Sequence, residues 1–302
     1  MNHKILITGA SGLIGSRLTE LLLRKGHHVS HLGRSKRVGS VSSFVWDVEK
    51  KSIDLQALEG VDTIINLAGA GVADKRWTTQ RKKEILESRT HSTQLLFETL
   101  KNQKHSVKTL VGASAIGYYG FGLHDEVFTE ESNAGNDFLA SVTKQWEEET
   151  DRIASLGVRL VKLRIGIVLS EKGGALIEMA KPIRLGVGSP LGTGQQYLSW
   201  IHIDDLCAMF IKAMEDEKMQ GAYNAVGNGW ITNEELTKAI ARVLKKPLWL
   251  PTVPAFAMKI VLGEMADIVL NGSKISSEKI QKTGFQLKYA EVDGALRNLL
   301  GK

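Results

Sequence analysis

Short runs of apolar, β-branched residues alternate with amphipathic segments through the first half of the chain. This alternation is typical of βαβ units that build a parallel sheet. Strands are expected at residues 4–8, 28–32, 44–46, 63–67, 109–114 and 159–163. Helices are expected at residues 13–25, 78–100 and about 134–155. The pattern therefore predicts an α/β fold, a Rossmann-type doubly wound parallel sheet.

The second half of the chain changes character after the glycine pair at 173–174. Residues 186–196 are rich in glycine and form a loop too long for a simple connection. Further elements are expected as a strand at 200–203, a helix at 204–214 and a helix from the capping box Thr232–Glu235 to about residue 244. Prolines at 247, 251 and 254 then mark a boundary. We expect a Rossmann-type domain at 1–246, with a substrate-loop insertion at about 173–199, and a smaller helix-rich C-terminal cap at 247–302.

Composition argues against several classes of protein. The 302 residues include a single cysteine, Cys207, so no disulfide framework within the chain is possible, and this fits a reducing compartment. No apolar stretch reaches the roughly 18–20 residues of a membrane helix, so we expect no membrane partner. The net charge of +6 is scattered along helical segments and not gathered into a patch, so we expect no nucleic acid. These features predict a cytoplasmic protein without a metal site.

Glycine spacing after the first expected strand indicates a phosphate-binding loop. Residues 8–15 read TGASGLIG and lead directly into the first expected helix. Gly9 and Gly12 would provide the tight turn and the close approach to a pyrophosphate, while Gly15 lets the helix pack on the sheet. The helix N-terminus adds N–H donors and a partial positive charge. We therefore predict dinucleotide contacts, in preference to a purely structural turn, from Gly9, Ser11, Gly12, Leu13, Ile14 and Gly15.

The end of the second expected strand favours NADP(H) as the dinucleotide. A site that prefers NAD places an acidic residue there for the ribose 2′-hydroxyl, but no Asp or Glu occurs between Glu20 and Asp47. Arg34 and Ser35 occur instead, and a guanidinium beside a hydroxyl suits a 2′-phosphate. The alternative is a solvated basic loop. Further cofactor contacts are expected from Asp47, toward the adenine amino group, and on the adenosine side from Leu67, Ala68 and Gly69.

Longer strings give the chain a family resemblance. The phosphate loop, residues 66–69 and residues 114–120 resemble extended short-chain dehydrogenases/reductases, the sugar-nucleotide epimerase/dehydratase group. A closer likeness, to the atypical epimerase-like family, rests on KRW at 75–77, ESR at 87–89, SAIGYYG at 114–120, RIGIVL at 164–169, WIHIDD at 200–205 and GEMAD at 263–267. Members are usually labelled nucleoside-diphosphate-sugar epimerases and carry a characteristic C-terminal segment of unknown role. The likeness covers essentially the whole chain.

The resemblance implies further site residues. It places Glu84 and Arg89 on the long helix facing the cofactor cleft, and it places the backbone of Ile167 on the nicotinamide side. Glu84 and Arg89 are five residues apart, about 500° around a helix, so they do not share one stripe. Two exposed helix charges are the alternative. Extended members also pair two long helices in a homodimer, which here would be 78–100 and 134–155.

The superfamily's catalytic pair is missing. Its chemistry uses a tyrosine and a lysine four residues apart on one helix, where the lysine lowers the pKa of the phenol. Here those positions fall on Leu139 and Thr143, or one residue later on Ala140 and Lys144. The remaining catalytic candidates are Ser114, which could bind a substrate carbonyl, and Tyr118 or Tyr119 as substitute acids. A His202–Asp204 acid/base pair is the weaker alternative, since that segment is structural in extended members.

Two functions follow from these features. The first is an NADP(H)-binding oxidoreductase or epimerase-like enzyme acting on a small or nucleotide-linked substrate under the C-terminal cap. The second is a non-catalytic NADP(H)-binding protein with a regulatory or redox-sensing role. The missing tyrosine and lysine favour the second, while Ser114 and the long loop at 186–196 favour the first. The sequence prefers the enzyme by a small margin and does not identify the substrate.

Overall fold

A large parallel sheet forms the centre of the protein in a computed structural model that describes residues 2–121 and 123–301. Its strands run in the order β12-β8-β6-β5-β1-β2-β3-β4, and every pairing is parallel except that of β3 with β4. The bounds are β1 (Lys4–Thr8), β2 (His28–Gly33), β3 (Ser42–Asp47), β4 (Ser52–Ile53), β5 (Thr63–Asn66), β6 (Thr109–Ala115), β8 (Arg159–Ile165) and β12 (Gly221–Ala225). The strand order reverses between β1 and β5, where such sheets bind ligands.

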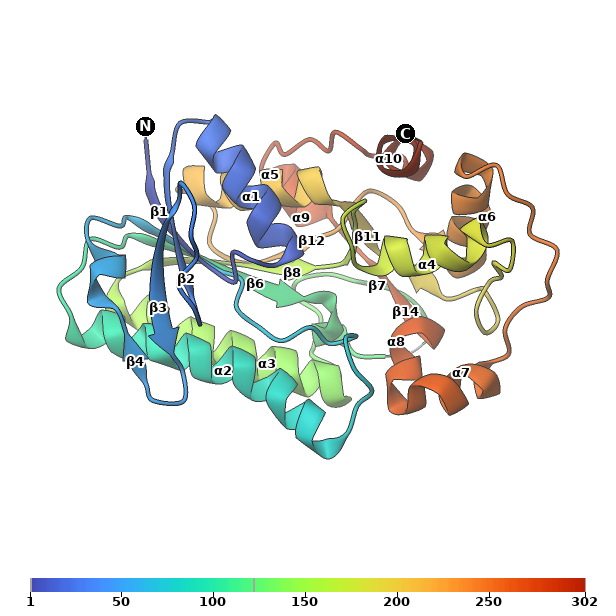
Figure 1. Ribbon diagram of the computed structural model, residues 1–302, viewed down its shortest axis with the longest axis horizontal. Helices are drawn as coiled ribbons and strands as arrows, with labels where there is room; N and C mark the ends of the chain where they lie inside the picture. Colours follow the sequence, from blue (N-terminus) through green and yellow to red (C-terminus); the bar gives the residue numbers. More distant parts are fainter. Residues whose placement is uncertain (1, 122, 302) are drawn as a thin grey trace.

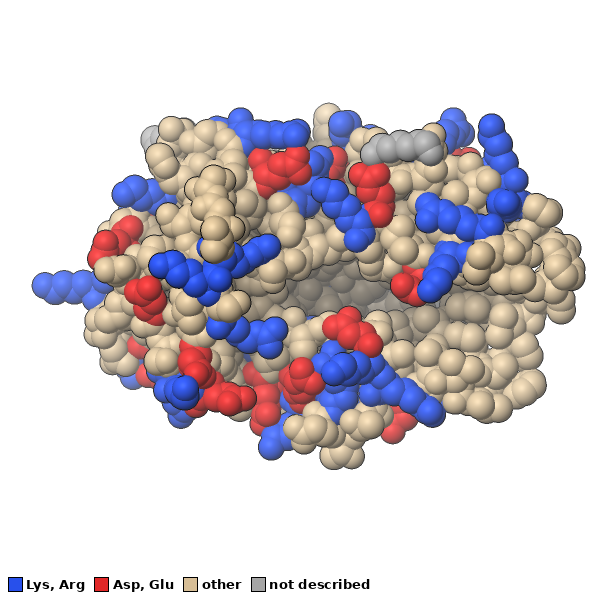
Figure 2. All heavy atoms as spheres, viewed as in Figure 1, with Lys and Arg blue, Asp and Glu red and all other residues tan. Residues whose placement is uncertain are grey.

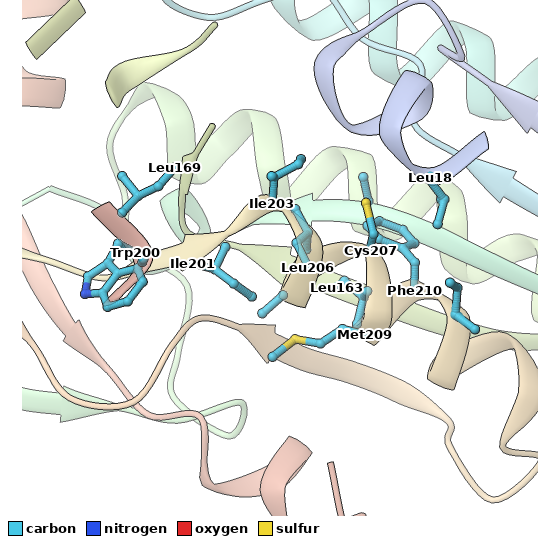
Figure 3. Close-up of a cluster of buried hydrophobic side chains, with 14 of the residues drawn as sticks. Leu18, Leu163, Leu169, Trp200, Ile201, Ile203, Leu206, Cys207, Met209 and Phe210 are labelled. Atoms are coloured by element: carbon cyan, nitrogen blue, oxygen red, sulfur yellow. The ribbon is translucent and has the colours of Figure 1, made fainter. Parts of the chain in front are cut away.

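Helices cover both faces of this sheet, as the alternating pattern predicts (Figure 1). On one face, α1 (Leu13–Arg24) packs beside α5 (Ile203–Glu215), and on the other α2 (Thr79–Asn102) packs beside α3 (Phe138–Asp151). Successive side chains of β1 enter opposite layers, with Ile5 and Ile7 in one core cluster and Leu6 in the other. Both faces are buried, so these strands read as continuous apolar runs. In Figure 3, Leu18 lies near Cys207 and Phe210 in the first cluster.

Smaller elements complete the fold among the described residues. Three two-stranded sheets pair β7 (Leu123–Phe128) with β14 (Gly272–Ile275), β9 (Ile167–Leu169) with β11 (Trp200–His202), and β10 (Tyr197–Leu198) with β13 (Ile231–Thr232). The other helices are α4 (Ala175–Arg184), α6 (Asn233–Val243), α7 (Ala255–Leu262), α8 (Asp267–Leu270), α9 (Glu278–Lys282) and α10 (Val292–Leu300). Four 3-10 helices are η1 (Leu55–Leu58), η2 (Ile116–Tyr119), η3 (Arg152–Leu156) and η4 (Gly263–Ala266).

The third long helix is shorter than its sequence pattern suggested. The expected start at residue 134 lies in a loop, and α3 begins at Phe138, because the Asp137 carboxylate caps it by accepting the N–H of Ala140 at 3.0 Å. Gly135 also packs on Gly120 so closely that a Cβ there would lie 2.6 Å from the Gly120 Cα. Gly135 and its contact with Gly120 therefore belong to the loop that precedes α3. The strand β12 was not anticipated, because its residues lack the β-branched pattern.

The C-terminal segment winds back over several parts of the fold (Figure 1). β14 pairs with β7, α10 packs on α6, and Leu296 belongs to the same buried cluster as α1 and α5. The Asp205 carboxylate accepts the N–H groups of Lys288 and Tyr289 at 2.8 and 2.9 Å. The C-terminal segment therefore contacts β7, α6, α5 and the buried cluster between α1 and α5. None of the described helices is long and apolar enough to span a bilayer.

Candidate cofactor and substrate cleft

A hollow crosses the middle of one face, with Lys and Arg side chains along much of its rim (Figure 2). In the same view, α1 and α4 lie above it and α2 lies below it (Figure 1). β1 and β5 pair in parallel in the centre of the sheet, so their carboxyl ends lie at the same edge. α1, which follows β1, lies above the hollow (Figure 1). The fold thus opens where the strand order reverses.

The phosphate loop has the close backbone approaches that its glycines predicted. Gly9 has φ +63°, and a Cβ on it would lie 2.6 Å from the Leu67 carbonyl oxygen. The Gly12 N–H donates to the Gly9 carbonyl at 3.0 Å, and a Cβ on Gly15 would lie 2.6 Å from the Ala10 Cα. Gly12 is the N-cap of α1 and has no side chain to cap it. The first turn of α1 therefore offers its N–H groups to an anion.

Thr8 holds the phosphate loop against the end of β5. Its hydroxyl donates to the Asn66 Oδ1 at 2.6 Å and accepts the N–H groups of Leu67 at 3.0 Å and Ala68 at 3.1 Å. The Asn66 amide donates to the Thr93 hydroxyl of α2 at 3.2 Å. No role for the side chains of Thr8, Asn66 or Thr93 was predicted from the sequence. Thr8 ends β1 and Asn66 ends β5, and this matching position is the one feature of the sequence that could have indicated their contact.

The predicted adenosine-side residues lie at the ends of β2 and β3. Arg34 and Ser35 follow β2 and are exposed. Asp47 ends β3, and its carboxylate already accepts the Lys50 N–H at 3.0 Å and pairs with the Lys50 ammonium at 3.4 Å. These hydrogen bonds lower the pKa of Asp47, the backbone N–H of Lys50 having the largest effect. Asp47 therefore remains an ionised acceptor beside the Arg34 loop.

Glu84 pairs within α2, whereas Arg81 and Arg89 connect α2 with the loop that follows β5. The exposed Glu84 carboxylate pairs with Arg81 at 2.6 Å, and another nitrogen of Arg81 donates to the Gly71 carbonyl. The Arg81 hydrogen bond is the main cause of the lowered pKa of Glu84, with a weaker effect of the Arg34 charge. Arg89 packs directly on Gly69, where an added Cβ would lie 3.1 Å from its guanidinium carbon.

Ile167 lies in β9, at a second strand end beside the cleft. Its N–H donates to the Ser199 carbonyl at 2.8 Å, so this donor is used within the protein. The preceding Gly166 approaches the same segment, since a Cβ on it would lie 2.4 Å from the Ser199 oxygen. Ile167 also pairs with Trp200 in the parallel β9–β11 ladder, so a contact of Ile167 with a ligand would use its side chain.

Two of the three catalytic candidates are buried in a polar network. The Ser114 hydroxyl donates to the Glu147 carboxylate at 2.6 Å, and Arg164 donates to both oxygens of that carboxylate at 2.8 and 3.0 Å. The Tyr119 hydroxyl donates to the Asn224 Oδ1 at 2.6 Å and accepts from Arg164 at 3.1 Å. Ser114 and Tyr119 are each only 3% exposed, and both hydroxyls are engaged in hydrogen bonds within the protein.

Burial and charge set the ionisation of this network. Burial raises the pKa of Tyr119 to about 12, although the Arg164 charge opposes the rise. Burial also opposes ionisation of Glu147, but the Arg164 hydrogen bond and the charges of Lys162 and Arg164 outweigh it and lower the pKa of that carboxyl group. Glu147 is therefore a permanent carboxylate and Tyr119 a permanent phenol near neutral pH.

Tyr118 is the third candidate and the one that is only half-buried. Its ring stacks on the Arg164 guanidinium, whose carbon lies 3.5 Å from the ring centroid. The ring also contacts Tyr119 edge-on, with centroids 5.4 Å apart. Among Ser114, Tyr118 and Tyr119, the phenol of Tyr118 is therefore the most accessible to a substrate.

Comparisons with known proteins identify the family. Residues 5–226 match the NAD dependent epimerase/dehydratase family, and residues 253–299 match a domain of unknown function (DUF1731). The chain belongs to the NAD dependent epimerase/dehydratase family. The epimerase family protein YfhF of Bacillus subtilis is 37% identical over 98% of this chain and 97% of its own length. A chloroplastic epimerase family protein, the SDR39U1 homolog of Arabidopsis thaliana, is 36% identical over 98% of this chain and 86% of its own.

Solved structures of similar proteins agree with the fold. Human epimerase family protein SDR39U1, isoform 2, solved with NADPH, matches with a TM-score of 0.88 at 31% identity over 98% of both chains. A nucleoside-diphosphate sugar epimerase of Corynebacterium glutamicum matches with a TM-score of 0.82 at 29% identity, over all of this chain and 59% of that one. A UDP-glucose 4-epimerase of Thermus thermophilus, in complex with NAD, has a TM-score of 0.77 at 21% identity and shows likeness of fold alone.

In this epimerase/dehydratase chain, the positions of the expected relay contain no free proton donor. Leu139 and Thr143 face η2, since a Cβ on Gly117 would lie 3.4 Å from the Leu139 Cβ and 3.7 Å from the Thr143 hydroxyl oxygen. That hydroxyl donates to the Leu139 carbonyl at 2.8 Å, within the helix. Lys144, in the alternative register, is exposed. The helix that would contain the tyrosine and the lysine is therefore present as α3, but neither of these residues occurs at the expected positions.

His202 and Asp204, the other acid/base pair considered, make structural contacts. The His202 ring caps α5 by accepting the Asp204 N–H at 3.0 Å, and it stacks on Tyr289 with centroids 3.8 Å apart. Arg17 of α1 binds both oxygens of Asp204 at 2.7 and 3.0 Å. These contacts join α5 to α1 and to the C-terminal segment of this epimerase/dehydratase chain.

Proposed function

We propose that the protein binds NADP(H) across the carboxyl ends of β1 and β5 and acts on a small or nucleotide-linked substrate as an oxidoreductase or epimerase-like enzyme. The observation that supports this best is the backbone cradle at Gly9, where even a methyl group would meet the Leu67 oxygen at 2.6 Å. Such an approach, directly before an uncapped helix N-terminus, is what a bound pyrophosphate needs.

The residues present fit the whole adenosine half of the cofactor. Ser11 and the N–H groups of Leu13 and Ile14 would hold the pyrophosphate at the start of α1, where Gly12 lets the ligand come close to the backbone. Arg34 and Ser35 would hold the 2′-phosphate after β2. The Asp47 carboxylate would accept from the adenine amino group. The backbone of Leu67, Ala68 and Gly69 would pass along the adenosine.

NADP(H) is proposed in preference to NAD(H) on two grounds. An exposed arginine beside a serine follows β2, in the place where an acidic side chain would select the 2′-hydroxyl of NAD. In addition, human SDR39U1, at 31% identity, was solved with NADPH. The relatives solved with NAD share only about a fifth of their residues with this chain.

Bound NADP(H) would supply a hydride donor or acceptor in the cleft. The chain's own contribution would be to bind and orient the substrate and to exchange a proton with it. Tyr118 is the best candidate for this proton exchange, because the hydroxyls of Ser114 and Tyr119 are buried and engaged with Glu147 and Asn224. Ser114 would then act by positioning the Glu147 carboxylate through their hydrogen bond.

A non-catalytic NADP(H)-binding protein is the second candidate. It is favoured by Leu139 and Thr143, which replace the tyrosine and lysine of the relay, and by the Thr143 hydroxyl, which bonds within α3. A protein that retains the cofactor cleft without this relay could report the redox state of the NADP pool by binding one form more tightly.

Cofactor choice is tested by titration of the purified protein with NADPH and NADH, followed by reduced-nicotinamide fluorescence. Arg34→Ala is expected to weaken NADPH by about 1.5–3 kcal/mol, the loss of a charged hydrogen bond, and to leave NADH unchanged. Arg297→Ala, an exposed arginine of α10, is the matched control. Equal loss of both cofactors would refute the 2′-phosphate contact, and binding of neither by the wild type would refute the proposal.

Turnover is tested on the tighter complex with a panel of carbonyl compounds and nucleoside-diphosphate sugars. Net oxidation of NADPH by a carbonyl compound, or conversion of a nucleoside-diphosphate sugar to its epimer with NADP⁺ bound, supports the enzyme. In either case, loss of the reaction in Tyr118→Phe and its retention in Tyr119→Phe supports Tyr118 as the acid. Tight binding of NADPH without turnover of any panel member favours the regulatory protein. The two Phe variants form a matched pair, since each removes one hydroxyl from adjacent rings.

A further inference from the structure

Helix α7 lies at the surface although most of its side chains are apolar. None of its 8 residues is buried, and Phe256, Ile260 and Val261 are 68%, 70% and 68% exposed. Residues four apart share one face of a helix, so Phe256 and Ile260 lie on one stripe, and Val261 lies beside it. A surface helix normally turns its apolar stripe toward the core. The apolar side chains of α7 instead form an exposed face.

The chain that leads into α7 adds further exposed apolar side chains. Trp249 donates its indole N–H to the Gly186 carbonyl at 2.9 Å, and the Val253 N–H donates to the Pro190 carbonyl at 2.9 Å. This part of the chain therefore runs alongside the loop that follows α4, and α4 and α7 lie at the same end of the molecule (Figure 1). We call the large exposed apolar side chains of this end the α4–α7 surface: Leu185, Val187, Trp249, Phe256, Ile260 and Val261.

The two segments that form this surface carry charge of one sign. Residues 179–203 and 236–263 contain no Asp or Glu. Two of their cations, Lys238 and Arg242, pair with acidic residues outside these segments. The others are exposed and form no ion pair within the part of the chain that the structure describes: Lys181, Arg184, Lys245, Lys246 and Lys259. Where α7 and α8 lie, Figure 2 shows a broad uncharged area with Lys and Arg side chains above it.

An anionic lipid surface fits these observations better than another protein does. A second copy of the chain, docked by the same face, would bring two sets of unpaired cations together. A peptide or helix that uses apolar anchors docks into a groove, whereas α7 projects from the molecule with none of its residues buried. A lipid interface is fluid and receives protruding apolar side chains, while Lys and Arg around them bind anionic headgroups.

We propose that the α4–α7 surface docks the protein on an anionic lipid surface, with Trp249, Phe256 and Ile260 in the headgroup region and Lys245, Lys246 and Lys259 at the lipid phosphates. The expectation of no membrane partner considered only a helix that spans the bilayer, and no described helix does so. Peripheral docking needs only shallow insertion of an apolar face together with electrostatic attraction. It is independent of the cofactor and of the proposed function.

Sedimentation of the full chain with vesicles tests the docking. Vesicles of equal parts phosphatidylcholine and phosphatidylglycerol are anionic, and vesicles of phosphatidylcholine alone are neutral. The wild type should bind the anionic vesicles at least about tenfold more tightly than the neutral ones, and added NaCl should release it. Phe256→Gln combined with Ile260→Gln removes apolar groups without adding charge and should weaken binding at least about tenfold. Lys245→Gln combined with Lys246→Gln should also weaken it at least about tenfold.

Matched controls lie outside the α4–α7 surface. Leu55→Gln removes an exposed leucine of η1, and Lys101→Gln combined with Lys104→Gln removes two exposed cations at the C-terminal end of α2. Both controls should bind the anionic vesicles like the wild type, and all variants should keep its melting temperature.

Three results with vesicles would overturn the inference: no binding of the wild type to anionic vesicles, equal binding to neutral ones, or unchanged binding when Phe256 and Ile260 are both replaced. A lower melting temperature of that double variant would show that the two side chains are buried, which also overturns it. A wild-type dimer that the same double variant dissociates would assign the α4–α7 surface to a second copy of the chain and not to lipid.

Discussion

The Ser114 hydroxyl donates to the Glu147 carboxylate at 2.6 Å and so connects the end of β6 to the middle of α3. The same carboxylate binds Arg164 of β8 and lies 3.2 Å from the Lys162 ammonium. All four residues are buried. The Ser114 hydroxyl, which the sequence offers for a substrate carbonyl, is therefore bonded within the protein to a buried charge cluster.

Glu147→Gln should destabilise the protein strongly, because it leaves the buried Arg164 without its counter-charge, whereas Lys162 keeps its ion pair with Asp151 at 2.7 Å. The expected loss is about 3–5 kcal/mol in the free energy of unfolding, measured by urea denaturation. Ser114→Ala removes one hydrogen bond to the same carboxylate and should cost about 1–3 kcal/mol. A Glu147→Gln variant no less stable than Ser114→Ala would contradict this account of the cluster.

Gly9→Ala should destabilise the protein and abolish NADPH binding, because the position combines a positive φ with a clash against the Leu67 backbone. Gly186→Ala is a matched control, since Gly186 has φ +77° but no heavy atom within 4 Å of the added Cβ. The control should lose only about 1–2 kcal/mol from the strained conformation. Equal losses of stability in the two variants would show that Gly9 is not closely packed against the Leu67 backbone.

His202 should make the stability of the protein fall as the pH is lowered below neutrality. Burial lowers its pKa below the ordinary 6.5, despite the nearby carboxylates of Asp204 and Asp205. The stability due to neutral His202 is present above pH 6.5 and is lost as the pH falls through the lowered folded-state pKa. His202→Asn keeps a side chain that can cap α5. In this variant the free energy of unfolding should change less with pH between the lowered pKa and pH 6.5. The exposed His91→Asn should leave the slope unchanged.

Cys207 should be unreactive in the folded protein. It is fully buried, and burial raises the pKa of its thiol to about 12, so almost no thiolate exists at pH 8. Iodoacetamide at pH 8 should label it only at the rate of unfolding and at once in urea. Rapid labelling of native protein, measured by mass spectrometry, would disprove its burial within the α1–α5 layer.

Helices and strands with a strong apolar periodicity could be predicted from the sequence. The cofactor and substrate site could be predicted only in part. The strand at 4–8 and the phosphate loop follow from local apolar pattern and glycine spacing, and the structure has both. The strand β12 and the pairing of β14 with β7 were not predicted, since short strands depend on partners distant in the chain. The role of Thr8 likewise depends on Asn66, 58 residues away.

By itself, the sequence determined the parallel sheet, the dinucleotide loop and the absence of the tyrosine–lysine relay, because each depends on residue type at short spacing. Only the tertiary structure decided which hydroxyls are free. Ser114 and Tyr119 lie buried because Glu147, Arg164 and Asn224 come from three other elements to bind them. In the same way, the packing of Arg89 against Gly69 and Trp146 brings together residues of α2, α3 and the segment after β5. Burial and pairing are set by neighbours far apart in the chain, and no local pattern encodes them.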